Sequence, residues 1–473
     1  MIVVSEYRGQ CVGVFGLGKA GSATVASLVA GGAKVFAWDD SFSPSPLMGE
    51  GAGGGDVASH SSPLSNPPTQ GGMGFERIHY SQWPWHELKV LVLAPGVPLT
   101  HPAPHAVVAM AHQHSVPILG DIELLYRAQP QARYVAITGT NGKSTTTALI
   151  GHILNEAGLR VQVGGNIGTA ALTLEPLGEG GIYVLETSSY QLDLVRTTRF
   201  NVAVFLNITP DHLDRHGTME NYVAAKCHIF ARQQPGDVAV IAVDDEWTRK
   251  IALSLQSPVS SVASLTEVSG YQPLQRGIFA EQGTLIDATG DRRLETGNLT
   301  SISSLTGRHN WQNAAAAYAA CRACGVAPDV IFAAMKTFPG LKHRLQLVAE
   351  IGGVRFINDS KATNADATSN ALAPYDTIYW ILGGKPKEGG IVSLSEYFPK
   401  IRHAFLIGQA AEEFARTLEG RVPYTHCGTL EAATKMAAAM AWQEKKSQAV
   451  VLLSPACASF DQWQSFEQRG DAF

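Results

Sequence analysis

The segment Gly139-Thr140-Asn141-Gly142-Lys143-Ser144-Thr145 constrains the fold more than any other part of this chain. It stands directly after a short apolar run, residues 134–138, and before a stretch rich in Thr and Ala. A glycine-rich turn between a strand and a helix points backbone N–H groups at phosphate oxygens, while Lys143 neutralises charge and Ser144 or Thr145 can hold Mg²⁺. The usual P-loop spacing would place a glycine at position 137, where this chain has Ile137, so the sequence predicts a shortened relative of that loop.

Short β-branched runs alternate with Ala-rich segments along the chain, which predicts an α/β fold with parallel sheets flanked by helices. At roughly 150 residues per domain, the length suggests about three domains. We expect a Rossmann-like domain over residues 1–132, a central P-loop-type domain over 133–341 and a second Rossmann-like domain over 342–473. The expected strands are 11–15, 34–38 and 90–94 in the first domain, 134–138, 160–163, 182–186, 202–207 and 238–243 in the second, and 354–359, 377–382, 403–407 and 449–454 in the third.

Charge and composition disfavour several classes of partner. Lys+Arg number 36 against Asp+Glu 41, so no global positive field attracts nucleic acid or a membrane surface. The six cysteines include a single Cys-x-x-Cys pair, Cys321 and Cys324, and no second pair to complete a zinc site, so a zinc site or a secreted disulfide framework is disfavoured. Without an apolar run of about 18 residues or a signal-peptide pattern, secretion and membrane spanning are disfavoured and a cytoplasmic protein is expected. We also expect a monomer.

One stretch departs from this average composition. Residues 41–75 contain 8 Gly, 7 Ser and 5 Pro among 35 residues, with no Lys or Arg. Such a stretch cannot bury enough apolar surface to offset the entropy of ordering it. We therefore predict a disordered insertion whose deletion leaves catalysis intact.

Three polar residues near the phosphate loop are candidates for metal binding or catalysis. Glu186 ends the apolar run 182–185, so its carboxylate is expected at the carboxyl edge of the sheet, where ligands bind. His212 lies in a polar cluster, residues 207–216, after the next strand. Lys226 lies among apolar residues of a predicted helix, and either snorkels to water or takes a catalytic role.

Gly16-x-Gly18-x-x-Gly21, followed by Asp39 at the end of the next strand, has the pattern of a dinucleotide-binding turn. A ligand with a diphosphate and a ribose would fit, whether NAD or a nucleotide sugar. In the third domain, the loops 358–364 and 383–385 each bring a lysine among small residues after a strand, as expected where an anionic substrate approaches the backbone. Arg344 either reaches a phosphate or is a solvated linker charge, and Cys457 lacks the partners of a nucleophile.

Together these segments resemble the Mur ligases, ATP-dependent enzymes that form amide bonds in peptidoglycan precursors. The Gly-Thr-Asn-Gly-Lys-Ser-Thr loop is shared with them and with folylpolyglutamate synthetases. Asn358-Asp-Ser-Lys-Ala-Thr-Asn and Ser454-Pro-Ala-Cys-Ala-Ser-Phe-Asp-Gln are similar to the members that add D-glutamate to UDP-N-acetylmuramoyl-L-alanine. The resemblance runs from about residue 12 to 473, apart from 41–75, and implies ATP, Mg²⁺, that UDP-sugar and D-glutamate as ligands.

The resemblance also implies a role for each matching position. Lys143, His212, Lys226 and Arg344 are the implied catalytic residues, and Lys226 is carbamylated in this family. The implied ATP-binding residues are Gly139, Thr140, Asn141, Gly142, Lys143, Ser144, Thr145, Thr146, Asn310, Asn313, Arg344, Asp359 and Lys361. The implied metal ligands are Ser144, Glu186, His212 and carbamylated Lys226. The implied UDP-sugar residues are Gly16, Gly18, Lys19, Ala20, Gly21, Asp39 and Asn166, and the implied D-glutamate residues are Thr363, Lys385, Ser459 and Phe466.

The chain departs from the family directly after Asp39. It has Asp40-Ser41 where better-known members carry a Thr-Arg pair close to the uridine, so contacts to uridine are not carried over at this point.

Other functions fit parts of the sequence. A nicotinamide-dependent dehydrogenase would use residues 16–39 but would leave the phosphate loop and the third domain unused. A non-catalytic nucleotide-sensing protein is disfavoured because Lys143, Glu186, His212, Lys226 and Lys361 are all present. A ligase that adds a different amino acid stays open within the family.

Overall fold

A computed structural model describes residues 1–42, 75–256, 264–386, 389–446 and 448–473. The predicted insertion 41–75 therefore lies almost entirely outside the described residues. At its two ends, Ser41 belongs to a short 3-10 turn and Phe75 begins a strand. The described chain divides into two compact units, Met1–Thr138 with Arg160–Asn201 and Thr209–Asp237, and Gly139–Leu159 with Val202–Ile208 and Val238–Phe473.

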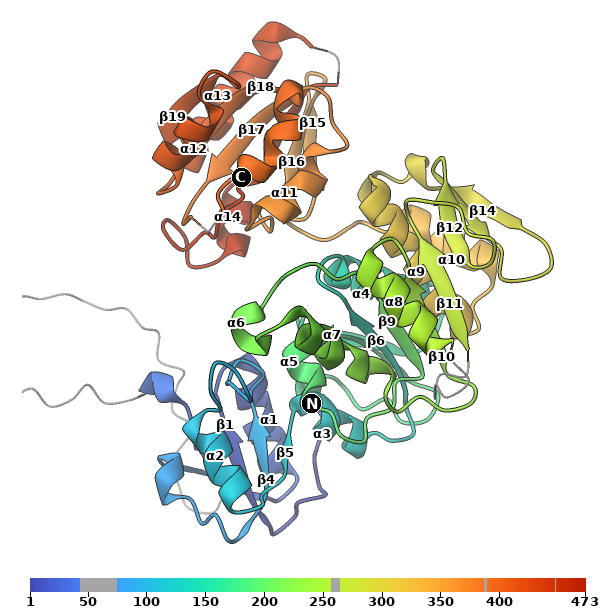
Figure 1. The fold of residues 1–473 in the computed structure, drawn as a ribbon, viewed down its shortest axis with the longest axis vertical. Coiled ribbons are helices and arrows are strands. Elements are labelled where there is room, and N and C mark those ends of the chain that lie inside the picture. Colours follow the sequence, from blue (N-terminus) through green and yellow to red (C-terminus); the bar gives the residue numbers. More distant parts are fainter. Residues whose placement is uncertain (43–74, 257–263, 387–388, 447) are drawn as a thin grey trace, which may run out of the picture. The chain divides into compact units, whose positions relative to one another are not determined.

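The first sheet has five strands, and all of its neighbouring pairs are parallel. Its order is β3-β2-β1-β4-β5, and Figure 1 labels β1, β4 and β5 of this sheet. The strands are β1 (Cys11–Phe15), β2 (Lys34–Trp38), β3 (Phe75–Arg77), β4 (Leu88–Leu93) and β5 (Ile118–Leu119), and the helices of this segment are α1 (Lys19–Ala30), α2 (Ala106–Gln113) and α3 (Asp121–Ala128). Strands β1 and β4 are almost wholly apolar because both faces of the sheet are covered.

The second sheet has nine strands in the order β14-β13-β12-β11-β10-β9-β6-β8-β7. They are β6 (Arg133–Thr138), β7 (Val161–Gly165), β8 (Ile182–Glu186), β9 (Val202–Phe205), β10 (Val238–Ala242), β11 (Leu265–Ser269), β12 (Ile278–Glu281), β13 (Thr284–Asp287) and β14 (Leu294–Asn298). Its helices are α4 (Lys143–Glu156), α5 (Ser189–Leu192), α6 (Leu213–His216), α7 (Met219–Cys227), α8 (Glu246–Leu255), α9 (Arg308–Ala323) and α10 (Pro328–Thr337). The Ala residues 314–317, 319 and 320 of α9 are buried, and these small side chains allow close packing against α4 and β12.

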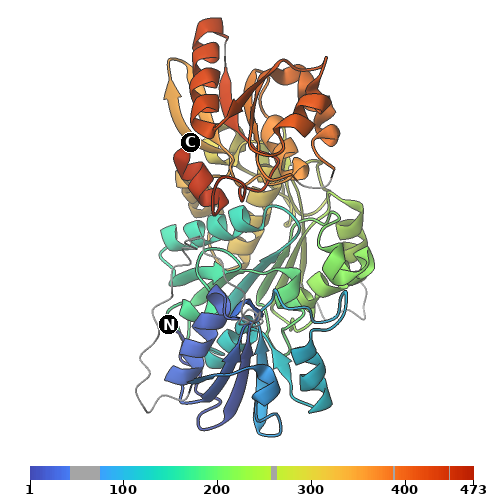
Figure 2. The same cartoon turned by 90° about the vertical axis from the view of Figure 1, so that its left-hand side faces the viewer.

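The third sheet has the order β15-β16-β20-β17-β18-β19. Its strands are β15 (Gln346–Ile351), β16 (Val354–Asn358), β17 (Ile378–Gly383), β18 (Ile401–Ile407), β19 (Tyr424–Gly428) and β20 (Val450–Leu453), and its helices are α11 (Ala365–Leu372), α12 (Ala411–Leu418), α13 (Leu430–Glu444) and α14 (Phe466–Ala472). Successive residues of β17 face opposite sides: Trp380 packs with α11 and α12, and Tyr379 packs with α13. Helices therefore cover both faces of this sheet (Figure 2).

The parallel α/β fold predicted from the sequence is confirmed, and the expected strands lie within about two residues of observed ones. The prediction missed β3, β5, β11 to β15 and β19, and three pairs are antiparallel: β12 with β13, β13 with β14 and β15 with β16. No helix among the described residues is long and apolar enough to cross a membrane.

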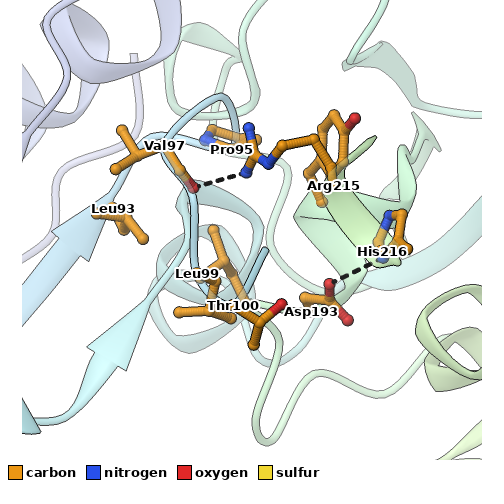
Figure 3. A pocket seen from close by; sticks show the side chains of 10 residues that line it. Leu93, Pro95, Val97, Leu99, Thr100, Asp193, Arg215 and His216 are labelled. Atoms are coloured by element: carbon orange, nitrogen blue, oxygen red, sulfur yellow. Dashed lines mark hydrogen bonds and ion pairs between the residues drawn. The ribbon is translucent and has the colours of Figure 1, made fainter. Parts of the chain in front are cut away.

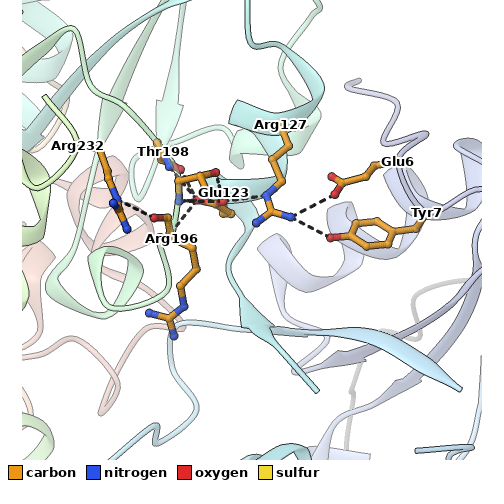
Figure 4. Close-up of polar contacts among 8 residues, drawn as sticks. Glu6, Tyr7, Glu123, Arg127, Arg196, Thr198 and Arg232 are labelled. Carbon is orange, nitrogen blue, oxygen red and sulfur yellow. Dashed lines mark hydrogen bonds and ion pairs between the residues drawn. The ribbon is translucent and has the colours of Figure 1, made fainter. Parts of the chain in front are cut away.

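A buried carboxylate ties α3 to a loop that follows α5 within the first unit (Figure 4). Glu123 of α3 accepts hydrogen bonds from the backbone N–H groups of residues 196–198, from two threonine hydroxyls in that loop and from the guanidinium of Arg127. Arg127 in turn bonds Glu6 and Tyr7 near the N-terminus. Burial alone would raise the pKa of Glu123, but these hydrogen bonds lower it to about 2.

Candidate active site

The predicted phosphate loop joins β6 to α4. Gly139 and Gly142 have φ values of +148° and +82°, which only glycine adopts without strain, and Gly142 caps α4. The Lys143 ammonium donates to the carbonyls of Gly139 and Thr140 at 2.9 and 2.8 Å. The loop therefore wraps around its own lysine at a helix N-terminus, an arrangement suited to an anion.

Asn207, which sequence reasoning did not select, holds this loop in shape. Its Oδ1 accepts from the Asn141 N–H at 2.8 Å, its Nδ2 donates to the Asn141 carbonyl at 3.1 Å, and its own carbonyl accepts from the Thr140 N–H at 3.0 Å. The side chain thus pairs with Asn141 as a neighbouring strand would. The only signal in the sequence was a polar residue directly after an apolar strand.

Two asparagines of α9 lie beneath the loop. Asn310 and Asn313 are buried and bonded to each other, Nδ2 of Asn313 to Oδ1 of Asn310, at 3.1 Å. A Cβ at position 142 would collide with Oδ1 of Asn313. Asn313 therefore supports Gly142, while the adenine contact implied for both residues stays a prediction.

Glu186 ends β8, and its register sets it opposite Ile137 of β6 and Gly165 of β7. The carboxylate is buried: Oε1 accepts from Nδ2 of Asn166 at 2.8 Å, and Oε2 has no hydrogen-bond partner among the described residues. A buried anionic oxygen without a partner is costly unless a cation compensates it. The residues present therefore fit a Mg²⁺ ion, which takes few protein ligands and fills its shell with phosphate oxygens and water. The described residues include no group of three His, Cys, Asp or Glu that could hold a metal ion alone.

Lys226, His212 and His216 gather around two tyrosine rings in the first unit. Lys226 is 2% exposed, and its ammonium lies 4.7 Å from the centre of the Tyr222 ring and 3.5 Å from Oγ1 of Thr138. His212 has φ +55° at the start of α6, is half exposed and approaches Tyr190 at 5.0 Å.

His216 is buried beside them, with Nε2 2.9 Å from the Ser189 hydroxyl and Nδ1 3.9 Å from Asp193 (Figure 3). Burial, with the positive charges of His212, Lys226 and Arg215, lowers the pKa of His216 to about 4, so this imidazole is neutral near pH 7.

The glycine turn after β1 engages Asp39 directly. One carboxylate oxygen of Asp39 accepts from the Leu17 N–H at 2.5 Å, and the other accepts from the N–H and hydroxyl of Ser41. Burial opposes ionisation of Asp39, but these bonds lower its pKa. Lys19, in the first turn of α1, donates to the carbonyl of Gly168, in the loop that follows Asn166.

Asp40 and Ser41 stand where the family pattern has a different pair. Oδ2 of Asp40 lies 2.9 Å from Nε2 of His105, and Oδ1 accepts from the Trp38 indole at 3.1 Å. The acidic residue is therefore fixed to its own sheet edge by two side chains.

Two contacts within the second unit join the phosphate loop to residues after position 342. Arg344 donates from Nη2 to the Ser144 hydroxyl at 2.8 Å, and Asn141 donates to Asp366 at 2.7 Å. Asp359 is buried, and its carboxylate accepts hydrogen bonds from the Ser454 hydroxyl and from the Leu345 N–H. Its burial raises its pKa to about 7.

Three of the residues implied for D-glutamate lie on loops that follow β16, β17 and β20, and the fourth, Phe466, begins α14. Lys385 is exposed, and its N–H donates to the Ala458 carbonyl beside buried Ser459. The Lys361 ammonium lies 4.0 Å above the Phe466 ring, and Thr363 follows on the same loop, half-buried.

Arg469, which sequence reasoning did not select, holds these loops together. It is fully buried and donates to the hydroxyl and carbonyl of Ser360 and to the carbonyl of Cys457. Its pKa is lowered to about 10 by burial.

Comparison with known proteins gives concordant matches. The Mur ligase middle domain matches residues 137–321, and the Mur ligase, glutamate ligase domain matches residues 343–457. The UDP-N-acetylmuramoylalanine–D-glutamate ligase of Rhodospirillum rubrum is 52% identical over 475 residues, covering 100% of this chain and 95% of the relative. The enzyme of the same name from Phenylobacterium zucineum is 49% identical, covering 100% and 97%.

Solved structures agree on the fold. MurF from Acinetobacter baumannii matches with a TM-score of 0.56 at 18% identity, covering 81% of this chain and 85% of that one. UDP-N-acetylmuramate-alanine ligase MurC from Thermotoga maritima matches with a TM-score of 0.55 at 16% identity, covering 98% of both chains. The chain therefore belongs to the Mur ligase family and, within it, to the group of the UDP-N-acetylmuramoylalanine–D-glutamate ligases.

Proposed function

We propose that this chain catalyses the ATP-dependent ligation of D-glutamate to UDP-N-acetylmuramoyl-L-alanine, releasing ADP and phosphate, in the synthesis of peptidoglycan precursors. The observation that carries the proposal is the match, over the whole chain at about half identity, to ligases of this name. We assign residues 1–132 to the UDP-sugar, 133–341 to ATP and 342–473 to D-glutamate, in a monomeric cytoplasmic enzyme.

The reaction joins a phosphoryl-transfer step to an acyl-transfer step. The alanyl carboxylate attacks the γ-phosphorus of ATP and ADP leaves; the D-glutamate amine then attacks the acyl phosphate carbon, and phosphate leaves from the tetrahedral intermediate. The protein has little covalent work, so its residues neutralise charge and align the reactants. Lys143 and the helix N-terminus at Gly142 are assigned to the ATP phosphates, and Arg344, already bonded to Ser144, supplies a second cation beside them.

Mg²⁺ bound at this site would screen the charge on the phosphate oxygens. Glu186 is its proposed ligand because Oε2 is buried without a partner, and Asn166 orients that carboxylate through Oε1. Ser144 and His212 are assigned to the metal as well.

Lys226 is proposed to carry a carbamate, as the family resemblance implies. The lysine amine would add to CO₂ and release a proton, and the oxygens gained would give a buried side chain the character of a carboxylate. When ligase activity is measured as ADP release, Lys226→Ala should lose most activity and partly regain it with added short carboxylic acids. A folded variant that no carboxylic acid rescues would count against the carbamate.

The D-glutamate carboxylates are assigned to Lys385, Thr363, Ser459 and Phe466, and the UDP diphosphate is assigned to the glycine turn at residues 16–21. The proposal is tested by measuring ADP release in the presence of ATP, UDP-N-acetylmuramoyl-L-alanine and D-glutamate. In parallel reactions, L-glutamate or D-alanine replaces D-glutamate. Turnover should require both substrates and select D-glutamate. ATP turnover without them would contradict the proposal, and selection of another amino acid would reassign the chain within the family.

A further inference from the structure

Arg215 joins two segments of the first unit that carry different parts of the proposed site. One segment is the substrate loop, residues 94–98, directly after β4. The other is α6, the one-turn helix that begins after His212. Figure 3 shows the guanidinium of Arg215 pointing at the substrate loop across a hollow that both segments line.

The substrate loop packs on the glycine turn proposed to hold the UDP diphosphate. The Ala94 N–H donates to the Phe15 carbonyl at 2.9 Å, which continues the pairing of β1 with β4. A Cβ at Gly16 would lie 2.5 Å from Cβ of Ala94 and 3.5 Å from Cγ2 of Val97. A shift of the substrate loop would therefore shift the wall of the glycine turn.

Arg215 holds the substrate loop through hydrogen bonds to the main chain of the loop. Nη1 donates to the Gly96 carbonyl at 2.6 Å and Nη2 donates to the Val97 carbonyl at 2.9 Å. The guanidinium also lies 4.8 Å from the centre of the Tyr190 ring, on which His216 stacks. Only the planar fork of arginine can bind two successive carbonyls while it stacks on a ring.

On its α6 side, Arg215 lies next to His212, a candidate metal ligand. Arg215 lies three residues after His212, and the Tyr190 ring contacts both side chains. No acidic side chain is hydrogen-bonded to the Arg215 guanidinium among the described residues, and its Nε is buried without a partner. The guanidinium thus donates its hydrogen bonds to main-chain carbonyls instead of forming an ion pair, as expected for a residue that holds a loop in position.

We infer that Arg215 is a positioning residue that holds the substrate loop against α6 and so fixes the UDP-sugar turn relative to His212. The inference rests on the proposed function for the identity of the UDP-sugar. Loss of Arg215 should loosen the substrate loop and weaken binding of the UDP-sugar, while ATP, which the second unit's phosphate loop is proposed to bind, should bind as before.

The test compares wild type with Arg215→Gln and Arg215→Lys by calorimetric titration with UDP-N-acetylmuramoyl-L-alanine. Arg215→Gln should raise the Kd roughly tenfold, because two charge-assisted hydrogen bonds to the loop are lost. The Kd of Arg215→Lys, whose ammonium can reach one carbonyl, should lie between those of wild type and Arg215→Gln. The KM for ATP should change less than twofold in both variants.

Arg232→Gln is the matched control, because Arg232 also donates to a main-chain carbonyl, that of Arg196, but is exposed and makes no hydrogen bond to the substrate loop among the described residues. It should leave both Kd and KM unchanged. Thermal unfolding shows whether each variant is folded. If Arg215→Gln does not fold, Arg215→Lys still tests the inference.

An unchanged Kd in a folded Arg215 variant, or an equal rise in the KM for ATP, would overturn the inference. If wild type binds the UDP-sugar without forming product, the proposed reaction fails while the binding comparison still judges Arg215. If wild type does not bind the UDP-sugar, both fall.

Discussion

Asn166 donates through Nδ2 to Oε1 of Glu186 at 2.8 Å, and the other oxygen of that carboxylate is left buried without a hydrogen-bond partner. The amide therefore fixes the plane of the carboxylate and determines where Oε2 points. A side chain that orients a metal ligand in this way is typically worth 10–100-fold in metal affinity. Asn166, implied by the resemblance as a sugar contact, therefore also orients the carboxylate that is proposed to bind Mg²⁺.

Asn166→Ala should raise the Mg²⁺ concentration needed for half-maximal activity about 10- to 100-fold, because Glu186 loses its orienting donor. The measurement is ADP release at a series of Mg²⁺ concentrations with saturating substrates. Asn298→Ala, which removes an asparagine that caps a 3-10 turn, is the control and should leave the Mg²⁺ dependence unchanged. An effect on the KM for the UDP-sugar alone would show that Asn166 contacts only the sugar.

Gly142→Ala should weaken ATP binding at least about tenfold, because the new Cβ collides with Asn313 and the residue has φ +82°. Gly158→Ala is a matched control: Gly158 has φ +77° at the end of the same helix, but a Cβ there meets nothing within 4 Å. Both variants carry the backbone strain, and only the first should change the Kd for ATP. Equal Kd values in the two variants would refute the steric argument.

The strands that carry the site were predictable because each is a buried parallel strand that reads as a continuous apolar run. Residues 182–186 and 11–15 match β8 and β1 to the residue. Glu186 ends the first run and the glycine turn that starts at Gly16 follows the second, and these features marked the sheet edges proposed to bind ligands. The missed strands lack that signal. β15 and β14 are largely exposed, and β5 has only two residues. The antiparallel pair β12 and β13 turns at Gln282-Gly283, where both residues have positive φ, a turn that a Gln-Gly pair signals weakly.

The site residues that could not be predicted from sequence patterns are those whose hydrogen-bond partners lie on loops distant in the sequence. Asn207 bonds a loop 66 positions away, and Arg469 bonds Ser360 across 109 positions. Neither belongs to a local motif, since an asparagine after a strand or an arginine in a C-terminal helix is ordinarily solvated. Their roles became visible only when the strand order showed which loops share a sheet edge.

Asn207→Ala should raise the Kd for ATP about tenfold, because the Asn141 N–H and carbonyl both lose their partners and the phosphate loop relaxes. Asn207→Asp keeps the acceptor for the N–H but sets a carboxylate oxygen against the Asn141 carbonyl, so it should be at least as damaging. Calorimetric titration with ATP and Mg²⁺ gives both values. Near-wild-type affinity in Asn207→Asp would mean that the donor half of the pair contributes nothing.

Glu123→Gln should lower the free energy of unfolding at pH 7 by about 3 kcal/mol, since the backbone and hydroxyl donors of residues 196–198 and the Arg127 guanidinium lose a buried anionic acceptor. Urea denaturation followed by fluorescence measures the loss. Glu246→Gln is the control, because Glu246 is an exposed carboxylate paired with Lys250, and its removal should change stability little.

The same carboxylate predicts how this stability depends on pH. The pKa of Glu123 is about 2 in the folded chain against an ordinary value of 4.5, so the folded state favours the ionised form. Its contribution, about 3 kcal/mol, is fully present above pH 4.5 and is lost as the pH falls from 4.5 towards 2. The difference in unfolding free energy between wild type and Glu123→Gln should therefore narrow across that window. A difference that stays constant from pH 6 to pH 3 would show that hydrogen-bond geometry, and not the charge of Glu123, holds α3 to the loop at residues 196–198.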